Sequence, residues 1–122
     1  MIQLRNINKS FSENNVLKNI TFNINDNECV AIIGKSGSGK SVLLKHIIGL
    51  MKPDSGDVII NDQNINSISF KKLQQLRGSI GMVFQFGALF DSMTVEENIR
   101  LALDKFSNLS KDLIKEKIIN VL

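Results

Sequence analysis

Hydrophobic and polar positions alternate along the first part of the chain. Apolar residues loosely alternate with polar ones over residues 2–8, and a second alternation runs from Val16 to Ile24. A period of two is typical of a half-buried β-strand. The polar cluster at residues 12–15 separates the two segments. The pattern therefore predicts two strands joined by a turn.

A different pattern follows from Cys29 to Ile33, where five apolar residues stand in a row. Such a run, rich in β-branched residues, predicts a strand covered on both faces. The glycine-rich residues 34–39 cannot extend that strand, and from Lys40 the apolar spacing becomes helical. The sequence thus predicts a buried strand, a glycine-rich loop and an amphipathic helix in succession.

Shorter elements separated by turn-forming residues are expected over residues 53–84. They are a turn at 53–56, a strand over 57–60, a turn at 61–64, a helix from about Phe70 to Gly78, and a strand over 80–84.

The last part of the chain predicts two helices. Thr94 followed by Glu97 has the form of a capping box, which would start a helix running through Leu103. Ser110 caps a further apolar pattern that is still running at Leu122. Because no terminating signal or linker is found, we expect Leu122 to mark a cut through a domain.

Composition indicates one globular domain, with 122 residues of which 43% are hydrophobic and 22% charged. The net charge of +3 is small, and Trp and Tyr are absent, so a nucleic-acid partner is not expected. The lone cysteine, Cys29, is expected to be a buried, reduced residue of a cytosolic protein. Residues 1–5 are not followed by an apolar run, so a signal peptide is not expected, and no apolar run approaches about 18 residues. We therefore expect any membrane contact to go through a partner.

The glycine-rich loop matches the phosphate-binding pattern G-x-x-x-x-G-K-[ST]. Gly37 and Gly39 can adopt positive φ, which turns successive N–H groups toward one point, and the following helix adds its positive end. Lys40 can bridge the β- and γ-phosphates of ATP, and Ser41 can ligate Mg²⁺. The predicted ATP-binding residues are Gly34, Lys35, Ser36, Gly37, Ser38, Gly39, Lys40 and Ser41.

A resemblance to a known family is carried by five segments: Ile2–Ile7, Val16–Phe22, Glu28–Gly34, Ile48–Gly56 and Val83–Gln85. With these segments and the glycine-rich loop, nearly all of the chain resembles the nucleotide-binding domain of ABC transporters. The resemblance implies an α/β fold with a P-loop NTPase core and an antiparallel β-subdomain over about 1–85. A Q-loop and the start of a helical subdomain would follow over about 85–122, where the domain is truncated.

The resemblance also implies roles for two further residues. Phe11 falls where the family places an aromatic side chain that stacks on adenine; the alternative is a phenylalanine that packs at a strand end. Gln85 falls in the Q-loop, which implies that it reaches the Mg²⁺ ion and the attacking water, and that its loop touches a transmembrane subunit.

The segment over residues 86–99 is similar to the Mla/Mkl-type ATPases, which serve lipid transporters with MCE-domain partners. Part of this segment has a structural alternative, because Leu89 and Phe90 could be buried and Thr94 with Glu97 could be a helix cap only.

Several motifs of a complete ABC ATPase are missing from these 122 residues: the Leu-Ser-Gly-Gly-Gln signature, a Walker B strand with its acid pair, and a switch histidine. Asp62 follows apolar residues but is expected to be a turn residue. His46 is expected to be a partly exposed helical residue.

The resemblance implies the energy-coupling subunit of a lipid-type ABC transporter. Its partners would be transmembrane permease subunits, a second ATP-binding subunit and an MCE-domain protein, and it would lie on the cytoplasmic face of the cell membrane through the permease. One alternative is a non-catalytic truncated remnant with weak nucleotide binding. Another is a small P-loop kinase, against which the region of Gln85 argues.

Overall fold

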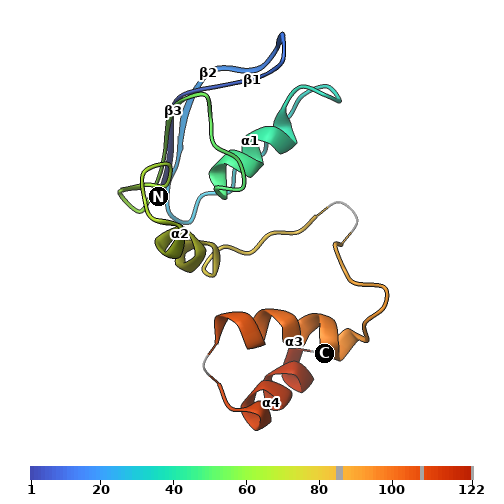
Figure 1. Cartoon of the computed structure of the whole chain (residues 1–122). Coiled ribbons are helices and arrows are strands. Elements are labelled where there is room, and N and C mark those ends of the chain that lie inside the picture. Colours follow the sequence, from blue (N-terminus) through green and yellow to red (C-terminus); the bar gives the residue numbers. More distant parts are fainter. Residues whose placement is uncertain (85–86, 108, 122) are drawn as a thin grey trace. The chain divides into compact units, whose positions relative to one another are not determined.

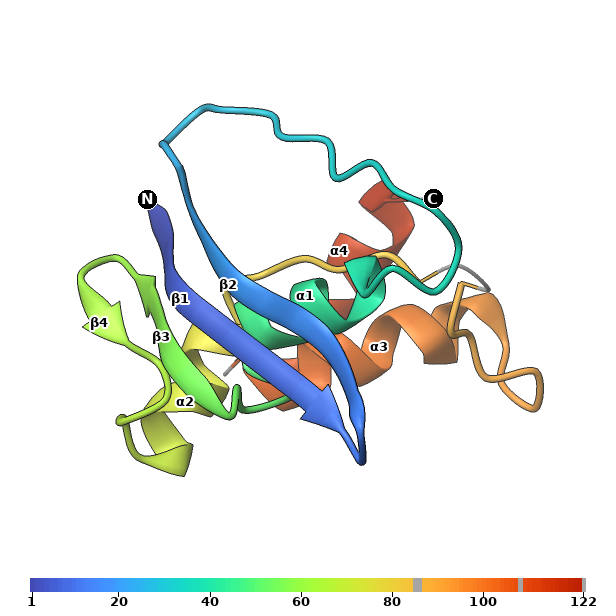
Figure 2. The same ribbon diagram turned by 90° about the horizontal axis from the view of Figure 1, so that it is seen from above.

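Strand β1 (Ile2–Phe11) forms the centre of an antiparallel sheet. It pairs with β2 (Asn14–Ile24) on one side and with β3 (Ser55–Ile60) on the other, and β4 (Gln63–Asn64) pairs with β3 (Figures 1 and 2). This computed structural model describes residues 1–84, 87–107 and 109–121, which divide into two compact units, Met1–Ile80 and Gly81–Leu122. The two strands expected from the alternating pattern are confirmed.

Helix α1 (Lys40–Ile47) lies against one face of this sheet (Figure 2), and side chains from both form the core of the first unit. Alternation along β1 places Leu4 and Ile7 inward, and helical spacing along α1 brings Leu43 and Ile47 to meet them. The buried residues of this core are Leu4, Ile7, Leu17, Leu43, Ile47, Val58, Ile60 and Ile65.

Asparagine side chains shape the hairpin of β1 and β2. Asn6 and Asn19 have positive φ, at 51° and 50°, and the register of the two strands shifts between Leu4 and Ile7. The side chain of Asn8 joins the two irregular points, because its Nδ2 donates to Asn6 O at 2.8 Å and its Oδ1 accepts from Asn19 N at 2.8 Å. Irregular pairing of this kind bends a strand locally, so these residues set the direction of the hairpin end.

Helix α2 (Phe70–Arg77) closes the first unit and confirms the helix expected to end at Gly78. Ser69 caps its first turn, and Arg77 in its last turn donates hydrogen bonds to Ile48 O and Gly49 O at the end of α1. These carbonyls would otherwise lack an intrahelical partner, so Arg77 ties the two helix ends together.

The strands expected over 29–33 and 80–84 are not formed. Neither segment forms a strand with any described residue. Ile33 and Val83 are each 93% exposed, although Ile32 and Ile80 pack partly against the core. A strand covered on both faces needs paired neighbours at its edges. Both segments therefore have the apolar composition of a strand, but no described segment pairs with them.

Two single-residue expectations were also wrong. Cys29 is exposed rather than buried, because the segment that carries it is unpaired. His46 is completely buried rather than partly exposed, because it lies three residues after Leu43 and so falls on the buried stripe of α1. Its Nδ1 lies 2.6 Å from Val42 O, and its Nε2 has no hydrogen-bond partner among the described residues.

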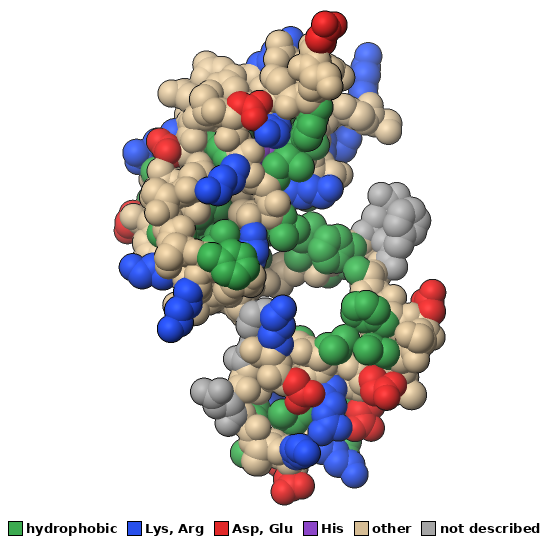
Figure 3. All heavy atoms as spheres, in the orientation of Figure 1, with side chains coloured by type: hydrophobic (Ala, Val, Ile, Leu, Met, Phe, Trp, Pro, Cys, Tyr) green, Lys and Arg blue, Asp and Glu red, His purple; other side chains and the backbone are tan. Residues whose placement is uncertain are grey.

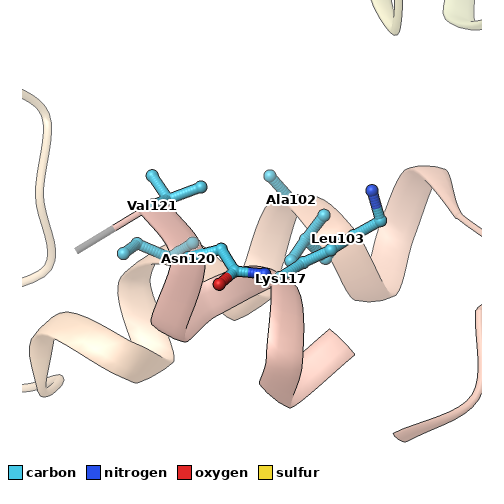
Figure 4. Close-up of a pocket in the computed structure, with 6 residues that line it drawn as sticks. Ala102, Leu103, Lys117, Asn120 and Val121 are labelled. Atoms are coloured by element: carbon cyan, nitrogen blue, oxygen red, sulfur yellow. The ribbon is translucent and has the colours of Figure 1, made fainter. Parts of the chain in front are cut away.

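The second unit contains α3 (Val95–Phe106) and α4 (Lys111–Val121), which confirms both helices expected there. The capping box is present: Glu97 N donates to Thr94 Oγ1 at 3.2 Å, and Thr94 N donates to Glu97 Oε2 at 2.7 Å. A largely apolar hollow of about 430 Å³ lies between the helices, with Ala102 and Leu103 on one wall and Val121 on the other (Figure 4). Leu89 and Phe90, for which burial was one alternative, are 70% and 57% exposed.

We expect α3 to lose helix content as the pH falls. The backbone N–H of Thr94, and then its side chain, hold the pKa of Glu97 below its usual value. The stabilisation is therefore fully present above the ordinary glutamate pKa of about 4.3 and is lost as the pH falls through the lowered value. Amide chemical shifts of α3 between pH 7 and pH 2 would measure the loss.

Glu97→Gln should show less α3 helix at pH 7 and a flatter pH dependence than the parent. Glu116→Gln, which removes a carboxyl from α4, should keep the parent's pH dependence in α3. Identical curves for the parent and Glu97→Gln would contradict the assignment.

Candidate phosphate-binding site

The loop that precedes α1 has the backbone of an anion cradle. Gly37 and Gly39 have φ of 76° and 90°, and Ser38 N donates to Lys35 O at 3.2 Å. Leu43 N donates to Gly39 O at 2.8 Å, which begins the helix. Left-handed residues between right-handed ones turn successive N–H groups toward one concave side, where the positive helix end adds to their field.

The three glycines of this loop have different roles. A Cβ on Gly34 would lie 2.7 Å from Ser38 Oγ, and one on Gly39 would lie 2.8 Å from Val16 Cγ1. At Gly37 a Cβ would meet no described atom within 4 Å. Gly34 and Gly39 thus allow close packing, Gly39 at positive φ as well, whereas Gly37 combines positive φ with open space that a ligand can enter.

Lys40 reaches back across the loop. Its ammonium donates to Gly34 O at 2.9 Å and to Lys35 O at 2.8 Å. Phosphate oxygens are stronger acceptors than exposed carbonyl oxygens, so a bound phosphate can replace these partners. Ser41 follows on α1 with an exposed side chain, available to a ligand of the loop.

Phe11 lies at the end of β1, in the hairpin whose residues Val16 and Leu17 approach this loop. A Cβ on Gly39 would lie 2.8 Å from Val16 Cγ1 and 3.1 Å from Leu17 Cδ2, both on β2. Phe11 pairs with Asn14 in the same hairpin. Phe11 is 43% exposed and is not among the buried core residues. The structure therefore brings the aromatic residue and the glycine-rich loop together in one unit.

The structure bears differently on two further residues of the sequence analysis, Gln85 and Asp62. Gln85 lies outside the described residues. Asp62 has φ of 62° in the two-residue turn between β3 and β4, which confirms it as a turn residue.

Across the described parts of the chain, no group of three or more His, Cys, Asp or Glu side chains could hold a metal ion. No helix within the described ranges is long and apolar enough to cross a bilayer.

The sequence analysis did not identify the side-chain contacts of two residues, Lys9 and Asn98. The ammonium of Lys9 lies 5.5 Å from the centroid of the Phe11 ring. In the second unit, Asn98 accepts from Phe90 N at 2.8 Å and donates to the carbonyls of Phe90, Met93 and Thr94. The only sequence signal for Asn98 was its position in the first turn of a capped helix.

Exposed apolar side chains occur in both units, and green atoms reach the surface at several places in Figure 3. Leu89, Phe90 and Met93 line a hollow of about 240 Å³ that also includes Asn98. Neither this hollow nor the one between α3 and α4 contains a residue of the predicted phosphate loop.

The chain is similar to curated proteins over its whole length. It is 42% identical to Protein TRIGALACTOSYLDIACYLGLYCEROL 3, chloroplastic, of Arabidopsis thaliana, covering 100% of this chain and 35% of that protein. It is 44% identical to the methionine import ATP-binding protein MetN of Legionella pneumophila (strain Paris), covering 100% and 36%. It is 35% identical to the probable ribonucleotide transport ATP-binding protein mkl of Mycobacterium tuberculosis (strain ATCC 25618 / H37Rv), covering 96% and 34%. The chain thus spans about a third of the length of the curated relatives it matches.

Solved structures share the fold. A dimeric ATP-binding cassette in a post-hydrolysis state, bound to ADP and Pi, is 34% identical with a TM-score of 0.87, over 98% of this chain and 55% of that one. The α/β P-loop fold with its antiparallel β-sheet and helices is therefore established for this part of the domain. A family model described as ABC transporter matches residues 17–121. By sequence, fold and the geometry of its glycine-rich loop, the chain belongs to the ABC transporter family.

Proposed function

We propose that this chain is the phosphate-binding half of the ATP-binding, energy-coupling subunit of an ABC transporter. The observation that carries the proposal is the loop at Gly34–Ser41, in which Gly37 and Gly39 have positive φ and the Lys40 ammonium donates to the carbonyls of Gly34 and Lys35. The likeness to a cassette bound to ADP and Pi supports a nucleotide as the ligand. The loop amides and Lys40 would hold the phosphates of ATP.

Magnesium and the base would be held by neighbouring residues. The Ser41 hydroxyl is a hard oxygen ligand of the kind Mg²⁺ takes alongside phosphate oxygens. Gln85 would complete the site from the Q-loop, in a domain divided at about residue 85 into a core and a helical subdomain. Phe11 would stack on the base. The hydrolytic step needs an acid pair and a signature motif that these 122 residues do not contain.

The segments 29–33 and 80–84, which form no strand with the described residues, suggest where the rest of the domain belongs. We propose that they pair with strands from the part of the family's domain that this chain does not span. The complete subunit would dimerise, as the similar cassettes do, and would bind permease subunits from the cytoplasmic side of the membrane.

For the cargo, we propose a lipid, with an MCE-domain protein as a further partner. The similarity of residues 86–99 to lipid-transport ATPases and the Arabidopsis relative support it. Methionine is the second candidate, because the MetN relative of Legionella is 44% identical. Membership in the ABC transporter family argues against the small kinase, while the truncated remnant remains an alternative that binding measurements address.

Calorimetric titration of the chain with Mg·ATP tests the proposed nucleotide binding. A second titration with Mg·GTP tests how the base is recognised. Stacking recognises the π-face that every base has, so we expect ATP and GTP to bind within about tenfold of each other. Phe11→Ala should weaken both, by about 1–3 kcal/mol.

Matched titrations with inorganic triphosphate separate the possible failures. Normal ATP binding by Phe11→Ala would show that this residue is not the base platform. Failure of the parent to bind either ATP or triphosphate would favour the truncated remnant.

A further inference from the structure

Asp54, in the turn before β3, holds the end of strand β1 by three contacts. Its Oδ1 accepts a hydrogen bond from Lys9 Nζ at 2.6 Å, and its Oδ2 accepts from Ser10 N at 2.7 Å. Its own backbone N–H donates to Asn8 O at 2.9 Å. Three consecutive residues of β1 are therefore fixed immediately before Phe11.

The contact between Lys9 and Asp54 is an ion pair. The Lys9 ammonium and then the Ser10 N–H hold the pKa of Asp54 below its usual value, so the carboxylate is charged at neutral pH. The Lys9 side chain is only 16% exposed, whereas that of Asp54 is 48% exposed. The packed lysine stem and the charge-assisted hydrogen bond together keep the ammonium in one place.

The same ammonium lies over the Phe11 ring, 5.5 Å from its centroid. Lys9 and Phe11 are two residues apart in one strand, so their side chains stand on the same side of it. A cation over an aromatic ring is attracted by the negative charge of the ring face. Because Phe11 is still 43% exposed, Lys9 can fix the ring while leaving part of it open.

This arrangement lies beside the phosphate loop. Lys9 pairs with Leu17 in the sheet, and Leu17 Cδ2 is 3.1 Å from the position of a Cβ on Gly39. A nucleotide with its phosphates in the loop would thus have its base near the hairpin. A ring that is already held loses less conformational freedom when a base stacks on it.

We propose that Lys9 and Asp54 are positioning residues for the base of a nucleoside triphosphate: their ion pair orients the Phe11 ring for stacking. This inference rests on the proposed function of the neighbouring loop. It predicts that the pair affects binding of the base and not of the phosphates.

The experiment compares Mg·ATP with Mg-bound inorganic triphosphate in calorimetric titrations of the 122-residue chain. Lys9→Met keeps the stem and removes the charge, and Asp54→Asn keeps an acceptor and removes the charge. We expect each variant to bind ATP about three- to tenfold more weakly than the parent, because only part of the stacking interaction is lost. Each variant should bind triphosphate with an affinity within about twofold of that of the parent. In a Phe11→Ala background, Lys9→Met should have no further effect.

Lys18→Met is the matched control, because Lys18 is exposed on β2 and the substitution removes the same charge. It should bind both ligands as the parent does. ATP affinities within about twofold of the parent in both Lys9→Met and Asp54→Asn would overturn the inference, as would an equal loss for triphosphate. A parent that binds neither ligand would instead overturn the proposed function, and the inference with it.

Discussion

Replacing Lys40 by alanine is expected to abolish measurable binding of Mg·ATP while leaving the fold intact. The lysine supplies charge-assisted hydrogen bonds, each worth about 1.5–3 kcal/mol, and the concentrated negative charge of a triphosphate loses its nearest cation. Two such contacts amount to roughly a hundredfold or more in affinity. Calorimetric titration with Mg·ATP measures the loss, and circular dichroism checks the fold.

The same substitution costs little stability. In the free protein, the Lys40 ammonium is bonded to the carbonyls of Gly34 and Lys35, and both contacts are exposed. Water can replace an exposed hydrogen bond, so we expect a change below about 1 kcal/mol in the free energy of unfolding. The helix itself is held by Leu43 and Ile47 in the core.

Lys45→Ala is the matched control for charge. Lys45 is an exposed residue of the same helix, five positions beyond Lys40, and no contact of its side chain is found among the described residues. It should bind ATP within about threefold of the parent, since an exposed charge one turn away is screened. Equal affinity of Lys40→Ala and the parent would remove the phosphate assignment altogether.

The features that could be predicted from the sequence are those built by neighbouring residues. The phosphate loop depends on glycines and a lysine within eight positions, and the capping box on Thr94 and Glu97, three residues apart. The hairpin of β1 and β2 follows from one alternation repeated across a turn. In each case the chemistry of the segment itself is enough to select the conformation.

The features that could not be predicted depend on distant partners. Residues 29–33 have the composition of a buried strand, but pairing is set by other segments, and no described residue supplies it. The contact of Lys9 with Asp54 joins residues 45 positions apart, and neither residue type signals it. Burial of His46 follows from its helical spacing to Leu43 only once the helix is known to face the sheet.

Gly56→Ala is expected to destabilise the antiparallel sheet severely. Gly56 has φ of 92°, and a Cβ there would lie 2.3 Å from Asn6 O and 2.5 Å from Arg5 O. Both oxygens belong to the backbone of β1, close to the irregular point at Asn6, so no side-chain rotation can relieve the overlap. Either β3 moves away from β1, or the strand shifts and loses the bonds that Asn8 makes.

Two costs add at this position. Placing an alanine at positive φ costs about 1–2 kcal/mol, and forcing an extra carbon into a filled space costs about 1–3 kcal/mol. Their sum is a large part of the ~5–15 kcal/mol that stabilises a typical domain. We therefore expect a fall in melting temperature of roughly 10–20 °C, or failure to fold, measured by circular dichroism.

Alanine substitutions at two other glycines distinguish the conformational cost from the steric cost. Gly37 has φ of 76° but no described atom within 4 Å of its Cβ position, so Gly37→Ala should show the conformational cost alone. Gly81 has neither a positive φ nor a near neighbour among the described residues, so Gly81→Ala should change the unfolding free energy by no more than about 0.5 kcal/mol. If Gly56→Ala melts at the same temperature as Gly37→Ala, the backbone of Asn6 yields freely, and the sheet does not require a glycine at the start of β3.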